Sequence, residues 1–253
     1  MLSKIFNFKK KVVLITGSSG QVGSKIVKLY LSLGAKVYGL DINKSKFKNK
    51  NFFFFKIDIT DSQKIQKLFY EIFRKEKKID ILINNAATSV FTKIDQRNDN
   101  ELQKVFDLNL KSAINLIKYY FINYKKYYLK SASIINIASI YGLLSPDFNI
   151  YLKGDRFSSE IYGATKASII QITKYFAVLF AKNNIRVNVI SPGGILNKNI
   201  QTKRFIKNYS NRVPLKRMAN VQDLFTAILY LSSDYSKYST GQNIIVDGGL
   251  SIK

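Results

Sequence analysis

The sequence contains no cysteine and no histidine, so several common kinds of chemistry are excluded. Disulfide bonds, thiol nucleophiles, zinc sites and a Ser-His-Asp triad all depend on one of these residue types. Tyrosine, lysine, serine, asparagine and carboxylates remain for any reaction, and we expect no metal site. The lack of cysteine fits a reducing compartment, and we expect a cytoplasmic protein.

Acidic residues and long apolar runs are also scarce. The chain has 16 Asp and Glu against 41 Lys and Arg, a formal net charge of +25 that invites a nucleic-acid-binding interpretation. The lysines are spread along the whole sequence, however, and Lys9–Lys11 is their longest run, so we keep nucleic-acid binding only as an alternative. No apolar run approaches the roughly 18 residues of a membrane span. The basic start of the chain lacks the apolar core of a secretory signal, and we expect no membrane partner.

Strand and helix patterns alternate along the whole chain. The expected strands are 11–16, 36–41, 52–59, 79–84, 133–138, 186–190 and 243–246, and the expected helices are 22–33, 62–75, about 99–128, 162–182, 203–209 and 221–232. This alternation is typical of a parallel sheet with helices on both faces. Over residues 1–253 we find no linker or repeat, and we expect one α/β domain with a Rossmann-like, doubly wound, seven-stranded parallel sheet.

A glycine-rich turn connects the first expected strand to the first expected helix, and it reads Thr16-Gly-Ser-Ser-Gly-Gln-Val-Gly23. Such glycines let the backbone approach a pyrophosphate, which binds the free N–H groups and the positive dipole end of the helix. Asp41 ends the next strand, at about the spacing at which a carboxylate binds an adenosine ribose. A plain strand-to-helix connection and a helix cap are the alternatives, but together the two features favour a dinucleotide site.

Tyr162 and Lys166 lie one helical turn apart at the start of an expected helix. A free tyrosine has a pKa near ~10. An ammonium group at about 4 Å can supply the shift that proton transfer at neutral pH requires, so the pair can work as an acid–base couple. Pairs with this spacing also arise by chance on helix surfaces, and the meaning of this one depends on what the fold brings beside it.

Taken together, these segments resemble the short-chain dehydrogenase/reductase family over nearly the whole chain. The resemblance is carried by Thr16–Gly23, Asp58, Asn84-Asn-Ala-Ala87, Asn109, Ser139, Tyr162-x-x-x-Lys166, Pro192-Gly193 and Thr240–Gly249. It implies a single-domain oxidoreductase that moves a hydride between a nicotinamide cofactor and a carbon bearing a secondary alcohol or a ketone.

The resemblance also implies roles for individual residues. Tyr162 is expected to be the general acid/base, and Lys166 to lower its pKa and hold the nicotinamide ribose. Ser139 is expected to bind the substrate oxygen, and Asn109 to order a water beside Lys166. The expected cofactor-binding residues are Gly17, Ser19, Gly20, Gln21, Val22, Gly23, Asp41, Asp58, Ile59, Asn85, Ala86, Tyr162, Lys166, Pro192, Gly193 and Ile195. The carboxylate of Asp41 favours NAD over NADP, whose 2′-phosphate it repels.

Two features depart from the usual family pattern. The spacing Gly17-x-x-Gly20-x-x-Gly23 is closer to the longer, sugar-nucleotide-modifying branch, whereas the chain length and ending match the short branch. The interval from Ser139 to Tyr162 is longer than usual, so residues 145–160 are interpreted as an insertion beside the active site. We expect it to form a lid in which Arg156 binds an anionic group of the substrate. The alternative is a surface loop whose aromatic residues only pack onto the domain.

The insertion, with residues 191–195 and 214–220, resembles short-chain dehydrogenases of surface-sugar pathways, among them nonulosonate synthesis and flagellin modification. We therefore expect an NAD-dependent enzyme for an anionic small molecule, a sugar or sugar phosphate, that assembles as a homodimer or homotetramer. Within the same family, the alternative is a 3-oxoacyl-thioester reductase of fatty-acid synthesis. In other classes, the alternatives are a basic nucleic-acid-binding protein and a non-catalytic scaffold.

Overall fold

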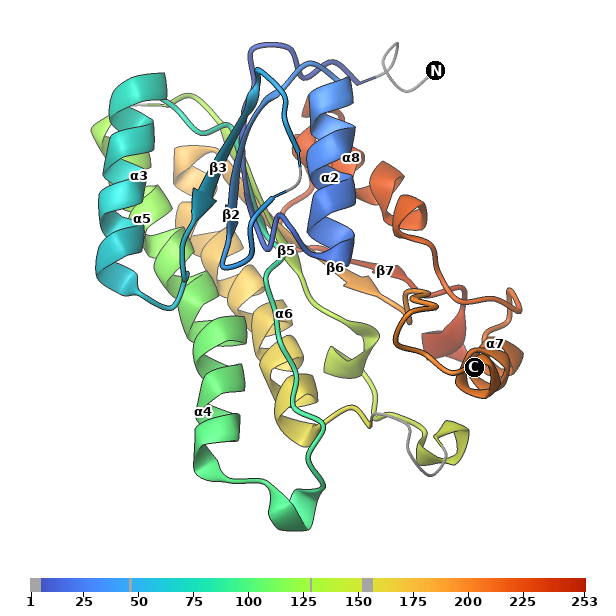
Figure 1. Ribbon diagram of the computed structural model, residues 1–253. Helices are drawn as coiled ribbons and strands as arrows, with labels where there is room; N and C mark the ends of the chain where they lie inside the picture. Colours follow the sequence, from blue (N-terminus) through green and yellow to red (C-terminus); the bar gives the residue numbers. More distant parts are fainter. Residues whose placement is uncertain (1–5, 46, 128, 152–156) are drawn as a thin grey trace.

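The structure is a computed structural model that describes residues 6–45, 47–127, 129–151 and 157–253. Its centre is a parallel seven-stranded sheet with the strand order β3-β2-β1-β4-β5-β6-β7 (Figure 1). The strands are β1 (Val12–Thr16), β2 (Lys36–Asp41), β3 (Phe52–Lys56), β4 (Ile81–Asn84), β5 (Ala132–Ile137), β6 (Ile185–Pro192) and β7 (Asn243–Val246). The helices are α2 (Gln21–Ser32), α3 (Ser62–Glu76), α4 (Asp99–Phe106), α5 (Ser112–Lys126), α6 (Glu160–Phe180), α7 (Lys203–Arg212) and α8 (Phe225–Ser232).

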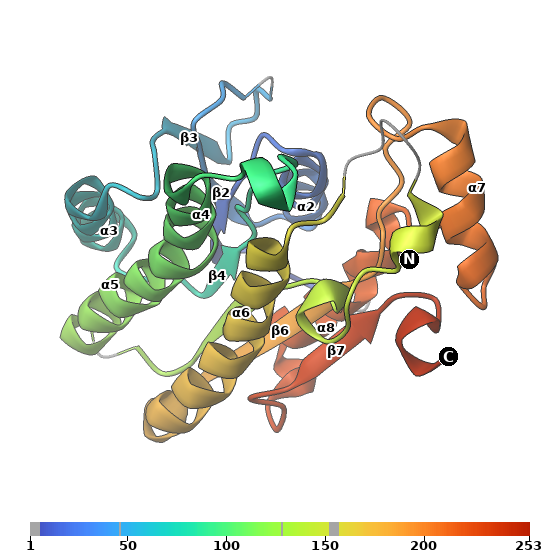
Figure 2. The same cartoon turned by 90° about the horizontal axis from the view of Figure 1, so that it is seen from below.

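Helices cover both faces of this sheet (Figures 1 and 2). Val13 and Ile15 of β1 pack into the core under α2 and α8, whereas Leu14 packs into the core under α3, α5 and α6. A strand that is buried on both faces needs apolar residues at successive positions, which explains the uninterrupted apolar run in β1. The doubly wound α/β fold expected from the sequence is confirmed.

Two of the differences from the expected element boundaries lie beside the candidate site. β3 ends at Lys56 instead of residue 59, because Asp58 accepts hydrogen bonds from the Thr60 N–H (2.9 Å) and hydroxyl (2.8 Å) and forms a turn. The helix expected at about 99–128 is divided into α4 and α5 by a π-helical turn over Asp107–Lys111. This turn contains Asn109, and such π-helical turns are frequent at functional sites.

The connections reverse direction in the middle of the sheet, between β1 and β4. The chain runs from β1 outward to β3 and then returns to β4 on the other side of β1. In open parallel sheets, ligands bind beside such a reversal, at the carboxyl ends of the strands. The last residues of β1, β2, β4 and β5 are Thr16, Asp41, Asn84 and Ile137. This edge of the sheet is therefore where a functional site is expected.

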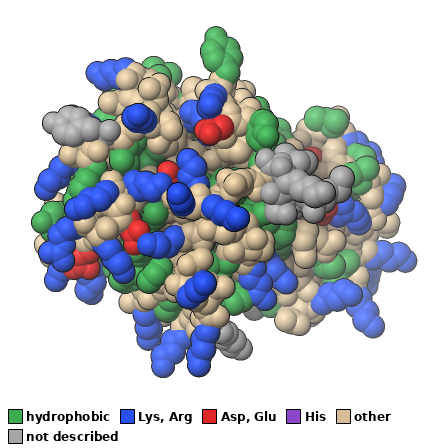
Figure 3. Space-filling model, turned by 90° about the horizontal axis from the view of Figure 1, so that it is seen from above, with side chains coloured by type: hydrophobic (Ala, Val, Ile, Leu, Met, Phe, Trp, Pro, Cys, Tyr) green, Lys and Arg blue, Asp and Glu red, His purple; other side chains and the backbone are tan. Residues whose placement is uncertain are grey.

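The positive charge is dispersed over the surface. In Figure 3, lysine and arginine side chains are scattered over the visible face among apolar and uncharged groups, with few acidic side chains between them. Within the described residues, no helix combines the length and the apolar character that crossing a membrane would require. The same residues contain no group of three or more His, Cys, Asp or Glu side chains that could hold a metal ion.

Candidate active site

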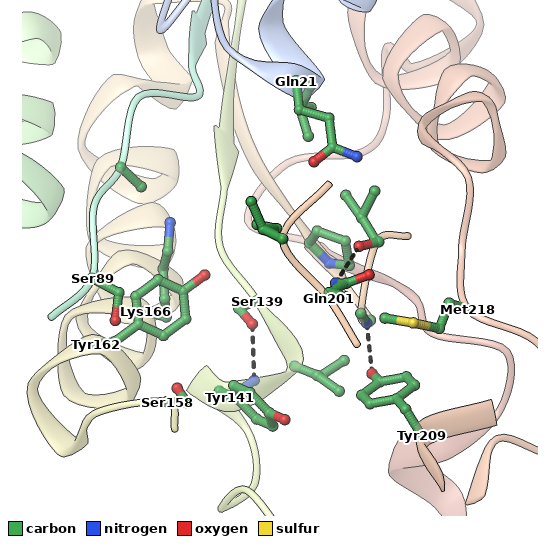
Figure 4. A pocket seen from close by; sticks show the side chains of 18 of the residues that line it. Gln21, Ser89, Ser139, Tyr141, Ser158, Tyr162, Lys166, Gln201, Tyr209 and Met218 are labelled. Carbon is green, nitrogen blue, oxygen red and sulfur yellow. Dashed lines mark hydrogen bonds between the residues drawn. The ribbon is translucent and has the colours of Figure 1, made fainter. Parts of the chain in front are cut away.

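Two adjoining cavities follow the carboxyl edge of the sheet. The first, which we call the tyrosine cavity, has a volume of about 590 Å³ and is lined by Ser139, Tyr162 and Lys166 (Figure 4). The second, the aspartate cavity, has a volume of about 630 Å³ and is lined by Asp41 and Asp58. The residues that line both are Gln21, Val22, Asn85, Ala87 and Thr88. The two cavities therefore form one cleft.

The turn from β1 to α2 is locked against the end of β4. The Thr16 hydroxyl accepts hydrogen bonds from the backbone N–H groups of Asn85 and Ala86, both at 3.0 Å. Gly17 has a φ of +65°, and a Cβ there would lie 2.9 Å from the Ala86 Cα. A Cβ on Gly23 would lie 2.0 Å from the Gly17 carbonyl oxygen. Both glycines are thus required by the close packing of the turn.

Helix α2 begins after Gly20, and among the described residues no side chain caps its first turn. In contrast, Asp61, Ser159 and Thr202 each accept a backbone N–H at the start of α3, α6 and α7. Uncapped first-turn N–H groups and the positive end of the helix dipole form a binding site for an anion. The start of α2 therefore fits the pyrophosphate of a dinucleotide.

Asp41 lines the aspartate cavity, and two backbone groups hold its carboxylate. One carboxylate oxygen accepts from the Ser19 N–H (2.9 Å), and the other accepts from the Asn43 N–H (2.8 Å). The side chain is buried, and each oxygen keeps a lone pair for another donor. A fixed carboxylate with free acceptor capacity fits the adjacent hydroxyls of an adenosine ribose.

Most of the cofactor residues expected from the sequence line this cleft. Asp58 and Ile59 line the aspartate cavity. Among the expected residues, only Ser19 and Gly23 line neither cavity, and both shape the glycine-rich turn. Pro192 ends β6, Gly193 and Ile195 follow it, and all three line the tyrosine cavity. That stretch includes Gly193, whose N–H donates to the Val246 carbonyl (2.9 Å) and fixes the end of β6 to β7.

In α6, Lys166 is buried and Tyr162 is half-buried, and their electrostatics differ from the sequence-based expectation. Lys166 Nζ donates to the Ile137 carbonyl (2.9 Å) and lies 5.5 Å from the centroid of the Tyr162 ring. Burial lowers the pKa of Lys166 to about 8. Burial also raises the pKa of Tyr162, and the hydrogen bond with Ser139 offsets part of that rise. The Tyr162 pKa is therefore raised overall instead of lowered as expected, because burial outweighs the effect of an ammonium group that is directed to the Ile137 carbonyl.

Ser139 lies where β5 passes into a short 3₁₀ turn, Ile140–Gly142. Its hydroxyl caps this turn by accepting from the Tyr141 N–H at 3.2 Å (Figure 4). A Cβ on Gly142 would lie 2.7 Å from the carbonyl carbon of Lys166, so only glycine lets the turn pack this closely on α6. The turn therefore brings Ser139 to the wall of the cavity that also contains Tyr162.

Asn109 does not line the cavity. Its Oδ1 accepts from the Thr88 N–H (2.8 Å), and its Nδ2 donates to the Thr88 carbonyl (2.9 Å) and the Thr165 hydroxyl (3.1 Å). Both Nδ2 hydrogens are thus used within the protein. The side chain connects the π-helical turn, the irregular segment after β4 and α6, and it positions Thr88 at the cleft.

The insertion packs against α7, a contact that the linear pattern did not reveal. Asp147 forms an ion pair with Arg212, and Asn208 Nδ2 donates to the Ile150 carbonyl (3.3 Å). The Tyr151 ring lies 5.5 Å from the Phe205 ring and lines the tyrosine cavity. The described part of the insertion is thus both packed and cavity-lining. Arg156, which was expected to bind an anionic group of the substrate, lies outside the described residues.

Several cavity residues escaped the sequence analysis because no motif marks them. Tyr209 of α7 accepts the Gly194 N–H at 2.6 Å, and burial raises its pKa to about 12. The hydroxyl groups of Tyr141 and Tyr151 lie 3.1 Å apart. Tyr209 is distant in sequence from Tyr141 and Tyr151, so only the fold brings it to the same cavity. Other residues of this kind include Ser89, Phe91, Ser158, Gln201 and Met218.

A parallel sheet with this cleft, and with Ser139, Tyr162 and Lys166 on one wall, defines a nucleotide-dependent oxidoreductase of the Rossmann type. Residues 17–251 match a family model described as enoyl-(acyl carrier protein) reductase. The 3-oxoacyl-[acyl-carrier-protein] reductase FabG of Buchnera aphidicola subsp. Schizaphis graminum (strain Sg) is 31% identical over 96% of this chain and 98% of its own length. An NAD-dependent glycerol dehydrogenase of Listeria innocua is 29% identical over 99% of this chain and 97% of its own.

A solved structure is more similar still. The short chain dehydrogenase from Leptospira borgpetersenii serovar Hardjo-bovis (strain JB197), crystallised with bound NAD+, is 41% identical. It superposes with a TM-score of 0.92 over 99% of this chain and 96% of its own. The chain therefore belongs to the short-chain dehydrogenase/reductase family of oxidoreductases.

The burial of Lys166 generates a pH-dependent prediction. The unfolded chain holds this proton up to the ordinary pKa of 10.5, whereas the folded chain releases it at about 8. The folded state is therefore stabilised as the pH rises between these values, by up to about 1.4 kcal/mol per pH unit. In urea unfolding, the free energy of unfolding of the wild type should rise relative to that of Lys166→Met over this range. Parallel curves for the two proteins would contradict the assignment.

Proposed function

We propose that the chain interconverts a secondary alcohol and a ketone with NAD(H), using Tyr162 as the general acid/base. The observation that carries this proposal is the wall formed by Ser139, Tyr162 and Lys166, which faces a cleft that is continuous with Asp41. When bound, a nicotinamide ring supplies or accepts the hydride. The other parts of the reaction, which are proton transfer, orientation and exclusion of water, fall to the protein.

The Ser139 and Tyr162 hydroxyl groups hold the substrate oxygen between them. In reduction, Tyr162 donates its proton to this oxygen as the neighbouring carbon gains the hydride, and in oxidation the proton returns. Lys166 is buried beside Tyr162, so its positive charge favours the tyrosinate that forms after the proton leaves. Asn109 positions this region through Thr88 and Thr165, and its side chain has no free donor for a water.

Replacing Tyr162 by Phe tests this assignment. The variant keeps the ring but loses the proton, so kcat should fall by roughly 10²–10⁴, while the dissociation constant for NADH stays within about twofold. Tyr70→Phe, on the outer side of α3, provides the matched control. Near-normal turnover by Tyr162→Phe would remove Tyr162 from the mechanism.

Asp41 supports a preference for NAD(H) over NADP(H), because its carboxylate is fixed by the Ser19 and Asn43 N–H groups and cannot turn away from a 2′-phosphate. We expect a higher kcat/KM with NAD(H). In Asp41→Asn, which keeps an oxygen acceptor and loses the charge, the preference should shrink by at least about tenfold. Equal or better efficiency of the wild type with NADP(H) would refute this assignment.

The lining of the tyrosine cavity supports a neutral, hydroxyl-bearing substrate. Its described residues include the hydroxyl groups of Ser89, Ser158 and Tyr141, and the aromatic rings of Phe91 and Tyr151. Among them Lys166 is the sole cation, and it is directed to a backbone carbonyl. We therefore favour a sugar or polyol without a phosphate. The Listeria innocua relative, named for glycerol, supports the same class.

A substrate panel discriminates between the possible classes. Initial rates are measured with NAD+ and neutral sugars or polyols, with their phosphorylated and nucleotide-linked forms, and with NADH and 3-oxoacyl thioesters. We expect kcat/KM to be at least about tenfold higher for a neutral substrate than for its phosphate, because the described lining offers a buried phosphate no free cation. A preference for a phosphorylated sugar would restore the sugar-phosphate interpretation based on Arg156.

The second candidate function is reduction of a 3-oxoacyl thioester, which the resemblance to FabG supports. Asp41 argues against it, since most enzymes of that group use NADPH. The two non-catalytic alternatives, a nucleic-acid-binding protein and a scaffold, have less support. The dispersed lysines (Figure 3) do not form a single basic face, and a scaffold would have no need for the buried Lys166.

Exposed apolar residues on α6 support a homo-oligomer. Val178 is 80% exposed and Tyr175 is 63% exposed, and Leu179 beside them is 44% exposed. A patch of this kind rarely faces water in a monomer. Light scattering should give a dimer or tetramer for the wild type and a smaller species for Val178→Glu, with Tyr70→Glu as the control. A monomeric wild type at micromolar concentration would contradict this expectation.

A further inference from the structure

Gln21 connects two parts of the cleft that are distant in sequence. It is the first residue of α2, in the turn expected to bind a pyrophosphate. Its Nε2 donates to the Leu196 carbonyl (2.7 Å), and its Oε1 accepts from Asn197 Nδ2 (3.0 Å). In Figure 4, the side chain of Gln21 extends from α2 into the cavity, above Gln201.

The segment that Gln21 reaches is held from its other sides as well. Gln201 Nε2 donates to the Ile195 carbonyl (3.0 Å), and Gln201 Oε1 accepts from the Asn197 N–H (2.7 Å). On the outer side, the Leu196 N–H donates to the Ala219 carbonyl (2.8 Å). Gln21 adds the connection to the dinucleotide side of the cleft.

This segment forms part of the wall of the tyrosine cavity and leads into α7. The residues that it contributes to the cavity are Ile195, Ile200, Gln201 and Thr202. Gln21 itself lines both cavities. A molecule at the uncapped start of α2 would therefore lie next to the side chain that fixes this wall. A glycine at position 21 would lack the hydrogen bonds to Leu196 and Asn197. The backbone does not call for glycine there, because Gln21 has no positive φ.

We propose that Gln21 is a positioning residue that couples occupancy of the dinucleotide side to the closure of residues 195–202 over the substrate side. The identity of the cofactor in this coupling rests on the proposed function. The hydrogen bonds from Gln21 to Leu196 and Asn197 do not depend on it. By closing this wall, Gln21 excludes water from the place where proton transfer occurs.

Hydrogen exchange of residues 195–202, followed by mass spectrometry, tests the connection directly. Gln21→Met keeps the length of the side chain and loses both hydrogen bonds. Its exchange in this segment should be faster by about tenfold than in the wild type, since two modest hydrogen bonds together contribute on the order of one power of ten. Gln66→Met, an exposed change on α3, should leave the exchange unchanged. Gln21→Glu keeps an acceptor for Asn197 and should be intermediate.

The same measurement with NADH at saturation tests the coupling. In the wild type, NADH should slow exchange of the segment further, and in Gln21→Met this protection should be reduced. The KM for the alcohol should also rise more than kcat falls. Equal exchange in the wild type and Gln21→Met would overturn the connection, and equal protection by NADH would overturn the coupling. If the wild type fails to bind NADH, the proposed function fails, while the exchange without NADH still decides the connection.

Discussion

The site depends on one hydrogen bond, from the Lys166 ammonium to the Ile137 carbonyl, which ties α6 to the end of β5. Burying an ammonium group without a carboxylate partner is costly, and the lowered pKa of Lys166 reflects that cost. The hydrogen bond fixes the side chain beside Tyr162, and the close approach of Gly142 brings Ser139 to the same wall. Stability is thus given up to hold a positive charge beside Tyr162, where the proposed reaction forms a tyrosinate.

The rest of the tyrosine cavity is formed by segments that adjoin the sheet only where they begin or end. The insertion packs on α7 through Asp147 and through the ring of Tyr151, and α7 in turn fixes Gly194 through Tyr209. Gln21 then connects the segment before α7 to the glycine-rich turn. A chain of contacts therefore runs from the glycine-rich turn to the insertion, and the proposed coupling would act through it.

The sequence predicted those features that depend on local chemistry. The glycine turn, the carboxylate at the end of β2, and the Tyr162–Lys166 pair lie on the same edge because parallel strands end together. The sequence did not predict the π-helical turn at Asn109, because its side chain is satisfied by a distant backbone. It also missed Tyr209, since its role comes from contact with Gly194 and no motif marks it. The direction of the Tyr162 pKa shift was misjudged because sequence spacing reveals neither the burial of the hydroxyl group nor the direction of the ammonium group.

The central claim is that this cleft holds a nicotinamide dinucleotide against the wall that contains Tyr162. Calorimetric titration of NADH into the wild type and into Gly17→Val tests it most directly, because a side chain at residue 17 would meet the backbone of Ala86 inside the turn. We expect saturable binding of one NADH per chain by the wild type and its loss in a Gly17→Val variant whose circular dichroism is unchanged. No binding to the wild type, or equal binding to both proteins, would contradict it.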